Sequence, residues 1–514
     1  MRQYEMCEIS FQGEKLTYDW ANIDLNATFS CGQIECSVKG FVAEDGIYKI
    51  RFLPEVAGVW NYHVMGVINE SGVVNVQPSE NTNHGKVRAV ECHFEYQDGA
   101  LFVPFGTTVY ALIHQPKYLI KETMETLGKA PFNKIRFCIF PKHYDYNHNE
   151  PEFFPFEKDE NSRWNVRRPC FQFWDALDES ILTLHKMGVE CDLILFHPYD
   201  RWGFSEFSEK EEQVYLDYLL RRLSAMPNVW WSLANEYDLI QGKSIERWNR
   251  IEVYLATNDS YHHLIGNHNC FRFWNHSRAN ITHASLQTKM LSRIPEWRKK
   301  YGKPICIDEC CYEGNILPQW GSISGKEMTY RFWRTITLGG YCTHGETYYN
   351  KEEVLWWSKG GKLIGESPIR IAFLKAIIDE LVGPIEPCRG MAEMFLNKTK
   401  EELKDKIKML PKEFASIANA VSEMDKEEMK IFFFAEPIYA GHVGDDAFLV
   451  FYDLRTCAKA ELQLPDDKKY KLELIDVWNM TRQVIKKEIS GRVEFDMPGE
   501  EGYAVLAKKI NIFH

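Results

Sequence analysis

Eight short apolar runs alternate with amphipathic helical segments between residues 98 and about 385, and this alternation constrains the fold more than any other feature. Alternating strands and helices imply parallel pairing, and eight such units in under 300 residues predict a closed (β/α)8 TIM barrel. An open doubly wound sheet is the alternative, but no Gly-x-Gly-x-x-Gly motif follows any run. The runs are Leu101–Gly106, Lys134–Phe140, Glu190–Phe196, Val229–Leu233, His263–Gly266, Ile281–Leu286, Pro304–Ile307 and Tyr341–His344. Helices are expected at Gln172–Lys186, Glu211–Ala225, Lys326–Leu338 and Ile369–Val382.

Both flanks of the expected barrel carry β-sheet patterns, which predict three domains: residues 1–96, 97–386 and 387–514. In the first, apolar and polar residues alternate over Tyr48–Phe52, the period of a half-buried strand. Pro54 and Gly58 then punctuate a turn before Trp60–Val64, which predicts a hairpin. Residues 386–430 are charged and helix-prone. A C-terminal β-sandwich is expected from Ile431–Phe434, Phe448–Tyr452, Tyr470–Val477, Arg492–Asp496 and Tyr503–Leu506.

Composition excludes several classes of protein. The net charge is -12 and there is no basic stripe, which argues against a nucleic-acid partner, because phosphate binding needs positive charge. No run of 18 apolar residues and no N-terminal apolar signal segment occurs, so neither a membrane partner nor secretion is expected. The 14 cysteines are scattered, which is typical of thiols in a reducing cytoplasm.

Two glutamates follow apolar runs on opposite sides of the expected barrel. Glu236 comes after Asn235 at the end of the fourth run, and Glu309 ends the seventh. Catalytic residues of such barrels lie at the carboxyl ends of the strands. Two carboxylic acids at one mouth suit glycosidic cleavage, in which one protonates the leaving oxygen and the other attacks the anomeric carbon. Asn235 would then face the 2-hydroxyl of the sugar.

This constellation resembles the clan A glycoside hydrolases, in which the acid/base follows Asn on strand 4 and the nucleophile ends strand 7. The resemblance implies that Arg136 contacts the nucleophile and that His197 is the polar residue ending strand 3. Within the clan, the chain is most similar to apiosidase-like barrels that carry an N-terminal β-sandwich and a C-terminal β-domain. Phe102–Thr108 and Trp60 carry this narrower resemblance.

Strands 6 and 8 depart from the clan pattern. His283 would lie inside strand 6, which makes Gln287 the expected residue at the mouth, and Glu346 after strand 8 is a third carboxylate. A sugar-stacking tryptophan is expected from Trp320, Trp356 or Trp357. No His-x-His or His-Glu-x-x-His motif occurs, so neither a metal nor another cofactor is expected. Further candidate substrate-binding residues at strand ends are His114, His143, Asp200, Trp202 and His268.

These residues lead to a hypothesis about mechanism. Glu309 would be ionised, with its pKa depressed by Arg136, while the pKa of Glu236 would be raised. Retention would require carboxyl groups about 5–5.5 Å apart. We expect an exo-acting enzyme on short oligosaccharides or glycosides from plant cell walls, pentosides included. A catalytically inactive carbohydrate-binding barrel, a transglycosidase or a lyase are the alternatives, and homo-oligomerisation stays open.

Overall fold

The computed structural model describes residues 1–80, 82–388, 405, 408, 411–425, 427, 428, 431 and 439–510. The chain forms two compact units. The first contains Met1–Lys289, Lys300–Met328 and Tyr341–Ile369, and the second contains Met290–Lys299, Thr329–Gly340 and Arg370–His514. The expected strand Ile431–Phe434 lies, after its first residue, outside the described residues, as does much of the segment 386–430.

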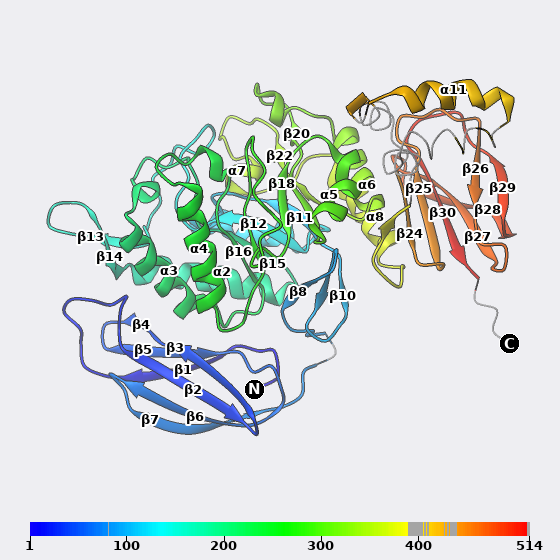
Figure 1. Cartoon of the computed structure of the whole chain (residues 1–514). Coiled ribbons are helices and arrows are strands. Elements are labelled where there is room, and N and C mark those ends of the chain that lie inside the picture. Colours follow the sequence, from blue (N-terminus) through cyan, green and yellow to red (C-terminus); the bar gives the residue numbers. More distant parts are fainter. Residues whose placement is uncertain are drawn as a thin grey trace. The chain divides into compact units, whose positions relative to one another are not determined.

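Eight parallel strands form the predicted barrel (Figure 1), in the order β17-β16-β15-β12-β11-β21-β19-β18. The two end strands meet as well, because the Thr282 backbone N–H donates to Ile265 O at 2.9 Å and His268 bridges Ser285 in parallel. The sheet therefore closes, as predicted. Its strands are β11 (Phe105–Thr108), β12 (Lys134–Cys138), β15 (Glu190–Ile194), β16 (Val229–Ser232), β17 (Ile265–Gly266), β18 (Ala284–Gln287), β19 (Ile305–Glu309) and β21 (Tyr341–His344).

Helices follow the strands in the order that the sequence predicts. The start of α3 is typical: Ser208 accepts the backbone N–H of Glu211, whose side chain returns to the Ser208 backbone, and this capping box fixes where the helix begins. The α-helices between residues 97 and 386 are α1 (Lys117–Leu127), α2 (Phe171–Lys186), α3 (Glu209–Leu223), α4 (Ile245–Asn258), α5 (Ile294–Tyr301), α6 (Gly325–Thr337), α7 (Trp356–Lys359) and α8 (Ser367–Ile378). Single turns of 3-10 helix are η1 (Leu112–His114), η2 (Phe204–Glu206), η3 (Tyr237–Leu239), η4 (Leu291–Arg293) and η5 (Gln319–Gly321).

The first barrel strand begins later than predicted. Leu101–Phe102 forms β10, which pairs antiparallel with β9 (His93–Tyr96) and not with the barrel, and β9 pairs in turn with β8 (Val87–Val90). Pro104 separates β10 from β11, because proline cannot donate to a strand ladder. The ring of Phe94 in this small sheet lies 5.1 Å from that of Trp230, at the amino end of the barrel. The small sheet therefore covers the amino end of the barrel.

A layer of charged residues fills the barrel interior. Lys134 contacts Asp308 at 2.7 Å and Asp192 at 2.9 Å, and Arg136 contacts Asp192 at 3.2 Å. The hydroxyl groups of Ser285 and Thr343 also donate hydrogen bonds to the Asp308 carboxylate. Lys134 and Arg136 are two residues apart on β12, so they share one face of the strand. Charges buried this deeply are tolerated because each has an opposite charge beside it.

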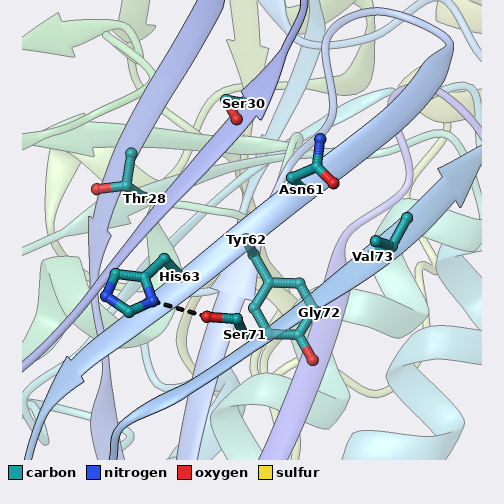
Figure 2. A pocket seen from close by; sticks show the side chains of 8 residues that line it. All are labelled: Thr28, Ser30, Asn61, Tyr62, His63, Ser71, Gly72 and Val73. Atoms are coloured by element: carbon teal, nitrogen blue, oxygen red, sulfur yellow. Dashed lines mark hydrogen bonds between the residues drawn. The ribbon is translucent and has the colours of Figure 1, made fainter.

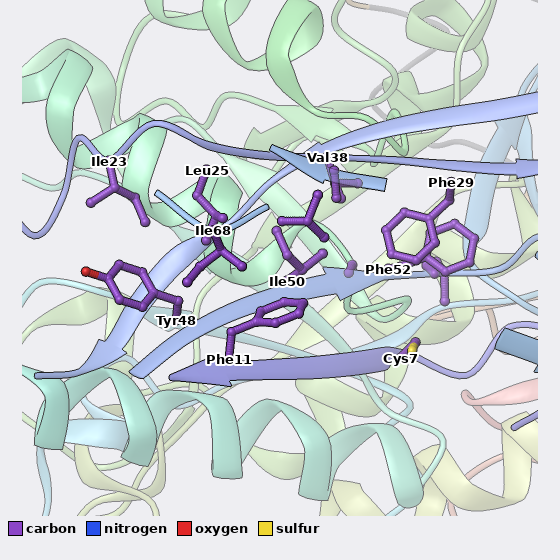
Figure 3. Close-up of a cluster of buried hydrophobic side chains, with 14 of the residues drawn as sticks. Cys7, Phe11, Ile23, Leu25, Phe29, Val38, Tyr48, Ile50, Phe52 and Ile68 are labelled. Atoms are coloured by element: carbon purple, nitrogen blue, oxygen red, sulfur yellow. The ribbon is translucent and has the colours of Figure 1, made fainter. Parts of the chain in front are cut away.

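The N-terminal region is a β-sandwich of two sheets, with orders β1-β5-β4 and β3-β2-β6-β7. The predicted hairpin is wrong: β5 and β6 follow each other in sequence but lie in different sheets. Their large side chains meet across the core instead, with the Phe52 ring 4.0 Å from Phe29 and 4.8 Å from Trp60, and Figure 3 shows Phe29 and Phe52 in this core. The strands are β1 (Cys7–Gln12), β2 (Leu25–Cys31), β3 (Ile34–Lys39), β4 (Phe41–Glu44), β5 (Ile47–Phe52), β6 (Gly58–Gly66) and β7 (Glu70–Val76).

Arg51 joins this sandwich to the barrel helices. Its guanidinium group donates to Asp178 of α2 at 2.6 Å and to the Arg222 carbonyl of α3 at 2.6 Å, while Glu8 lies at 2.9 Å. The side chain is 4% exposed. The sandwich therefore packs on the barrel through a buried charged contact as well as through apolar surface.

The second unit contains a six-stranded sheet, in the order β23-β24-β25-β30-β27-β28, and a two-stranded sheet of β26 and β29. Tyr470, Leu472 and Val505 are fully buried in the core between them. Among the described residues, no helix has the length and apolarity needed to cross a membrane. The elements are β23 (Glu386–Pro387), α11 (Lys412–Glu423), β24 (Tyr439–Val443), β25 (Ala447–Phe451), β26 (Lys459–Gln463), β27 (Tyr470–Asp476), β28 (Thr481–Ile489), β29 (Arg492–Asp496) and β30 (Tyr503–Lys509).

Candidate active site

Glu236 lies just beyond β16 in a left-handed backbone conformation, with φ 53° and ψ 55°. Such a conformation is uncommon for a residue with a Cβ and has to be held by its surroundings. His268 does so from both sides, since its Nδ1 accepts the Glu236 N–H at 3.4 Å and its carbonyl accepts the Tyr237 N–H at 2.9 Å. The carboxylate of Glu236 is thereby fixed at the barrel mouth, where Tyr199 donates a hydroxyl hydrogen bond to its Oε2.

Glu309 ends β19 and is 4% exposed. The hydroxyl of Tyr110, which follows the first barrel strand, donates a hydrogen bond to Oε1 of Glu309. The same hydroxyl lies 3.1 Å from Asn235 Oδ1 and 3.3 Å from the Tyr312 hydroxyl. Residues from three strand ends, those of β11, β16 and β19, therefore meet around one carboxylate.

The side-chain amide of Gln287 joins the two glutamates. With its nitrogen turned toward the acceptors around it, that nitrogen lies 3.2 Å from Glu236 Oε1 and 3.3 Å from Glu309 Oε2, and 3.1 Å from the Asn269 carbonyl. This orientation follows from the hydrogen-bonding partners, since oxygen in the same place would face only acceptors. The two carboxylates thus converge on one small space, where β18 places the residue that the sequence indicates for the mouth.

His268 is neutral and has a defined tautomer. Burial, and then the charge of Arg136, hold the pKa of its imidazole well below the usual range. Because Nδ1 accepts the Glu236 N–H, the proton must lie on Nε2. Nε2 is 3.9 Å from Glu309 Oε1 and has no hydrogen-bond partner among the described residues. A small approach of the two groups would add His268 to the donors around Glu309.

The electrostatics of Glu309 differ from the expectation. Burial and then the charge of Glu236 raise the pKa of Glu309 to about 7, although Arg136 and the hydroxyls of Tyr110 and Tyr312 lower it. Arg136 thus lowers the pKa of Glu309 as predicted, but the predicted net depression is wrong, because burial and the charge of Glu236 outweigh it. The ion pair of Arg136 within the described residues is with Asp192, and the guanidinium lies in the charged layer of the barrel. After burial, the charge of Glu236 is the next cause of the rise in the pKa of Glu309, so the charges of the two carboxylates oppose each other at the barrel mouth.

Lys142 and Tyr199 lie at this site, and sequence reasoning missed both. The Lys142 ammonium lies over the ring of Tyr110 at 3.4 Å and over that of Tyr199 at 4.3 Å. Both residues follow strands, β12 and β15, which is the signal that could have identified them. They lie in long aromatic loops, however, where many tyrosines compete for such a role.

Several predicted residues lie elsewhere. The buried ring of His114 stacks on Phe173 of α2, and His197 contacts the Phe140 carbonyl at 3.1 Å. Burial lowers the pKa of each to about 3. The carboxylate of Asp200 accepts backbone N–H groups of its own loop, and none of these contacts involves the two glutamates. The remaining candidates lie in mouth loops: His143 beside His148 at 3.2 Å, Trp202 bonded to Glu150 at 2.9 Å, and Trp320 under the Lys289 ammonium at 5.2 Å.

Glu346 belongs to a separate buried cluster with Glu313 and His344, whose potential ligand atoms lie within 4.8 Å of one another. Among the described residues, these three side chains are the group that could hold a metal ion. The Glu346 carboxylate, however, accepts the backbone N–H groups of Ile364 and Gly365 at 2.8 and 2.9 Å. Glu313 likewise accepts donors at the start of α8. Both carboxylates therefore brace the loop before α8, and no hydrogen bond or ion pair among the described residues joins Glu346 to Glu236 or Glu309.

A hollow on the N-terminal sandwich is a second place where small molecules could rest (Figure 2). His63 and Ser71 are hydrogen-bonded there at 2.7 Å. The lining contains no carboxylate, so it cannot provide the acid and nucleophile of a hydrolase. Its residues are Thr28, Ser30, Asn61, Tyr62, His63, Ser71, Gly72 and Val73.

Known proteins resemble the chain along its whole length. Residues 90–370 match the family described as apiosidase-like, catalytic domain, while residues 1–65 and 437–507 match two domains of unknown function, DUF5060 and DUF5605. No curated protein matches. A crystal structure of a provisionally assigned glycoside hydrolase from Bacteroides vulgatus is 30% identical, with a TM-score of 0.85 and 99% of each chain covered.

A second crystal structure supports the fold alone. It is a family 5 glycoside hydrolase from Bacteroides vulgatus, 14% identical, with a TM-score of 0.59 and coverage of 85% of this chain and 96% of that one. The family match covers more than half of the sequence, and it includes both glutamates and the complete barrel sheet. The chain therefore belongs to the apiosidase-like family of clan A glycoside hydrolases.

Proposed function

We propose that the protein is a retaining, exo-acting glycoside hydrolase in which Glu309 is the nucleophile and Glu236 the general acid/base. One observation carries this proposal: a single amide nitrogen, that of Gln287, lies within 3.3 Å of both carboxylates. The distance between Glu236 Oε1 and Glu309 Oε2 cannot exceed the sum of their distances to this nitrogen, which are 3.2 and 3.3 Å. That sum only reaches the lower limit of the carboxyl separation of roughly 6.5–9.5 Å that is typical of inverting enzymes. Retention is therefore the better fit.

The first step cleaves the glycosidic bond. Glu236 gives its proton to the leaving oxygen as the bond from that oxygen to the anomeric carbon breaks. An ionised oxygen of Glu309 forms the new bond to the anomeric carbon and becomes an ester oxygen. One proton on the pair at neutral pH is what this step needs, because one carboxyl group must donate while the other attacks.

The second step releases the sugar. Glu236, now a carboxylate, takes a proton from water, and the oxygen of that water attacks the anomeric carbon. The ester bond breaks, and the electron pair returns to Glu309. Tyr110 and Gln287 donate hydrogen bonds to the carboxylate of Glu309. They therefore stabilise the charge that develops on it as it leaves.

Short oligosaccharides or glycosides of plant cell walls, pentosides included, are the proposed substrates. The aromatic loops after β12 and β15 bring Tyr144 and Tyr199 beside the site, with ring centroids 5.8 Å apart. Such walls favour a pocket over an open groove and hence exo action. We propose a cytoplasmic location on the basis of the cysteine distribution, which fractionation of producing cells would test.

A screen tests the activity. Nitrophenyl α- and β-glycosides of apiose, arabinofuranose, xylose, galactose, glucose and rhamnose would be incubated with the wild-type enzyme, Glu309→Gln and Glu236→Gln. Proton NMR of the first product should show the anomeric configuration of the substrate. Azide should rescue a small-residue variant at Glu309 and yield a glycosyl azide of inverted configuration.

Three outcomes would contradict the proposal. A first product of opposite configuration would assign inversion. Normal turnover by Glu309→Gln would remove Glu309 as nucleophile. Faster release from polysaccharide than from the matching oligosaccharide would exclude exo action on short substrates.

A further inference from the structure

Lys142 is a buried lysine at the barrel mouth, beside the tyrosines that contact the two glutamates. The Lys142 ammonium lies 3.4, 4.3 and 4.4 Å from the ring centroids of Tyr110, Tyr199 and Tyr144. The residue is 2% exposed. Three aromatic faces therefore enclose one positive charge at the barrel mouth.

The contacts of the Lys142 ammonium differ from those of Lys134, another buried lysine of the barrel. Among the described residues, the Lys142 ammonium donates no hydrogen bond and forms no ion pair, whereas the equally buried Lys134 contacts both Asp192 and Asp308. Contact with aromatic faces offsets part of the cost of burying an ammonium group. Burial nonetheless lowers the pKa of Lys142, and the charges of Cys138, Glu236 and Glu309 oppose that shift.

The enclosing rings connect the lysine to the reaction. Tyr110 donates its hydroxyl hydrogen bond to Glu309, and Tyr199 donates its own to Glu236. A cation on the face of a phenol attracts the ring and polarises it, which makes its hydroxyl a stronger donor. Lys142 is thus linked to each of the two glutamates through one tyrosine.

We propose that Lys142 is a positioning residue: its ammonium group holds the Tyr110 and Tyr199 rings so that their hydroxyls point at Glu309 and Glu236, and it allows the two carboxylates to carry negative charge. This inference rests on the proposed function, because it assigns the lysine a part in that reaction. Lys142 itself need not touch the sugar.

Other groups around Lys142 and the carboxylates also set their titration. Each of them stays unchanged in the lysine variants below. They are Tyr110, Arg136, Cys138, Tyr144, His197, Tyr199, His268, Cys270, Asp308 and Tyr312.

The test measures titration without requiring turnover. Protein labelled with 13C at the glutamate Cδ would be titrated by NMR between pH 4 and 9, with Glu236 and Glu309 assigned from their Gln variants. In Lys142→Met, the midpoint of the pair should rise by about one pH unit, because a neighbouring positive charge is lost. Lys142→Arg should keep the wild-type midpoint. Lys158→Met is the matched control, since Lys158 lies over Trp164 at 4.6 Å and contacts neither carboxylate.

Activity provides a second readout. On the best substrate of the screen, the acidic limb of the kcat/KM profile should move up by the same amount in Lys142→Met and return in Lys142→Arg, while KM changes little. An unchanged midpoint in folded Lys142→Met would overturn the inference. If that variant does not fold, Tyr199→Phe serves instead, since it breaks the link to Glu236, and an unchanged midpoint there would count equally against it. Absence of turnover on every glycoside, with a shifted midpoint, would refute the proposed function alone.

Discussion

Tyr110 donates its hydroxyl hydrogen bond to Glu309 across the barrel mouth, from the end of the first strand to the end of the seventh. Tyr110 is 1% exposed, so water cannot replace the hydroxyl once it is removed. We expect Tyr110→Phe to lower kcat/KM by about 10- to 100-fold, the effect of one lost hydrogen bond to a charged group. Steady-state kinetics at pH 6 and 7 measure this, with the thermal unfolding midpoint as a check on folding. A loss smaller than threefold would show that Tyr312 is a sufficient donor.

The pKa of Glu309 predicts how stability depends on pH. A carboxyl group with a raised pKa of about 7 stabilises the fold fully below its unfolded value, and this contribution is lost as the pH rises toward 7. Glu309→Gln removes the titration. Relative to wild type, the variant should therefore gain about 3 kcal/mol in free energy of unfolding between pH 5 and pH 8. Urea unfolding at both pH values measures the difference, and a difference that stays constant with pH would refute the raised pKa.

Gln287 separates two carboxylates, and a third carboxyl group in its place should be poorly tolerated. In Gln287→Glu, like charges would meet within about 3.5 Å, so the pair should titrate about one unit higher and kcat/KM at pH 7 should fall more than tenfold. Gln287→Leu is the control for losing the amide without adding charge. The pH profiles of both variants distinguish repulsion from lost hydrogen bonds, because the acidic limb should move up further in the glutamate variant than in the leucine variant.

Arg51 should matter for stability and not for catalysis. Arg51→Ala leaves the buried Asp178 with Arg222 as its remaining partner and should cost about 3 kcal/mol in free energy of unfolding. Lys49→Ala on the same strand removes a partly exposed pair with Glu8 and should cost less than about 1 kcal/mol. Chemical denaturation of both variants measures the contrast. Equal losses would mean that the sandwich is held by its apolar contacts alone.

Much of the barrel was predictable because most of its strands lie in short, mostly apolar runs. A short apolar run such as Val229–Leu233 predicts a buried strand, and β16 occupies almost the same residues. The sandwich was harder. Tyr48–Phe52 and Trp60–Val64 carry strand periodicity correctly, but periodicity does not reveal the pairing partner, and the register instead joins β5 to β1 and β4. The spacing of apolar residues does not show which side chains meet across a core.

The candidate site was predictable where a residue ends a strand. Glu236, Glu309, Asn235, His268 and Gln287 were named on that rule, and the structure places them together. The rule fails for residues beyond the strands: Tyr199, Lys142 and Tyr312 reach the carboxylates from loops. It also misassigns His114, which lies in η1 beyond the end of β11, where its buried ring stacks on Phe173 of α2.

The left-handed backbone of Glu236 sets a conflict between folding and turnover. Glycine would relieve about 1 kcal/mol of strain at such a position, because it has no Cβ to crowd the carbonyl. A lineage released from selection on sugar cleavage would therefore drift toward glycine there and gain a firmer fold. Inactive homologues descended from this enzyme should therefore carry glycine in place of Glu236. Restoring glutamate in them should lower their melting temperature.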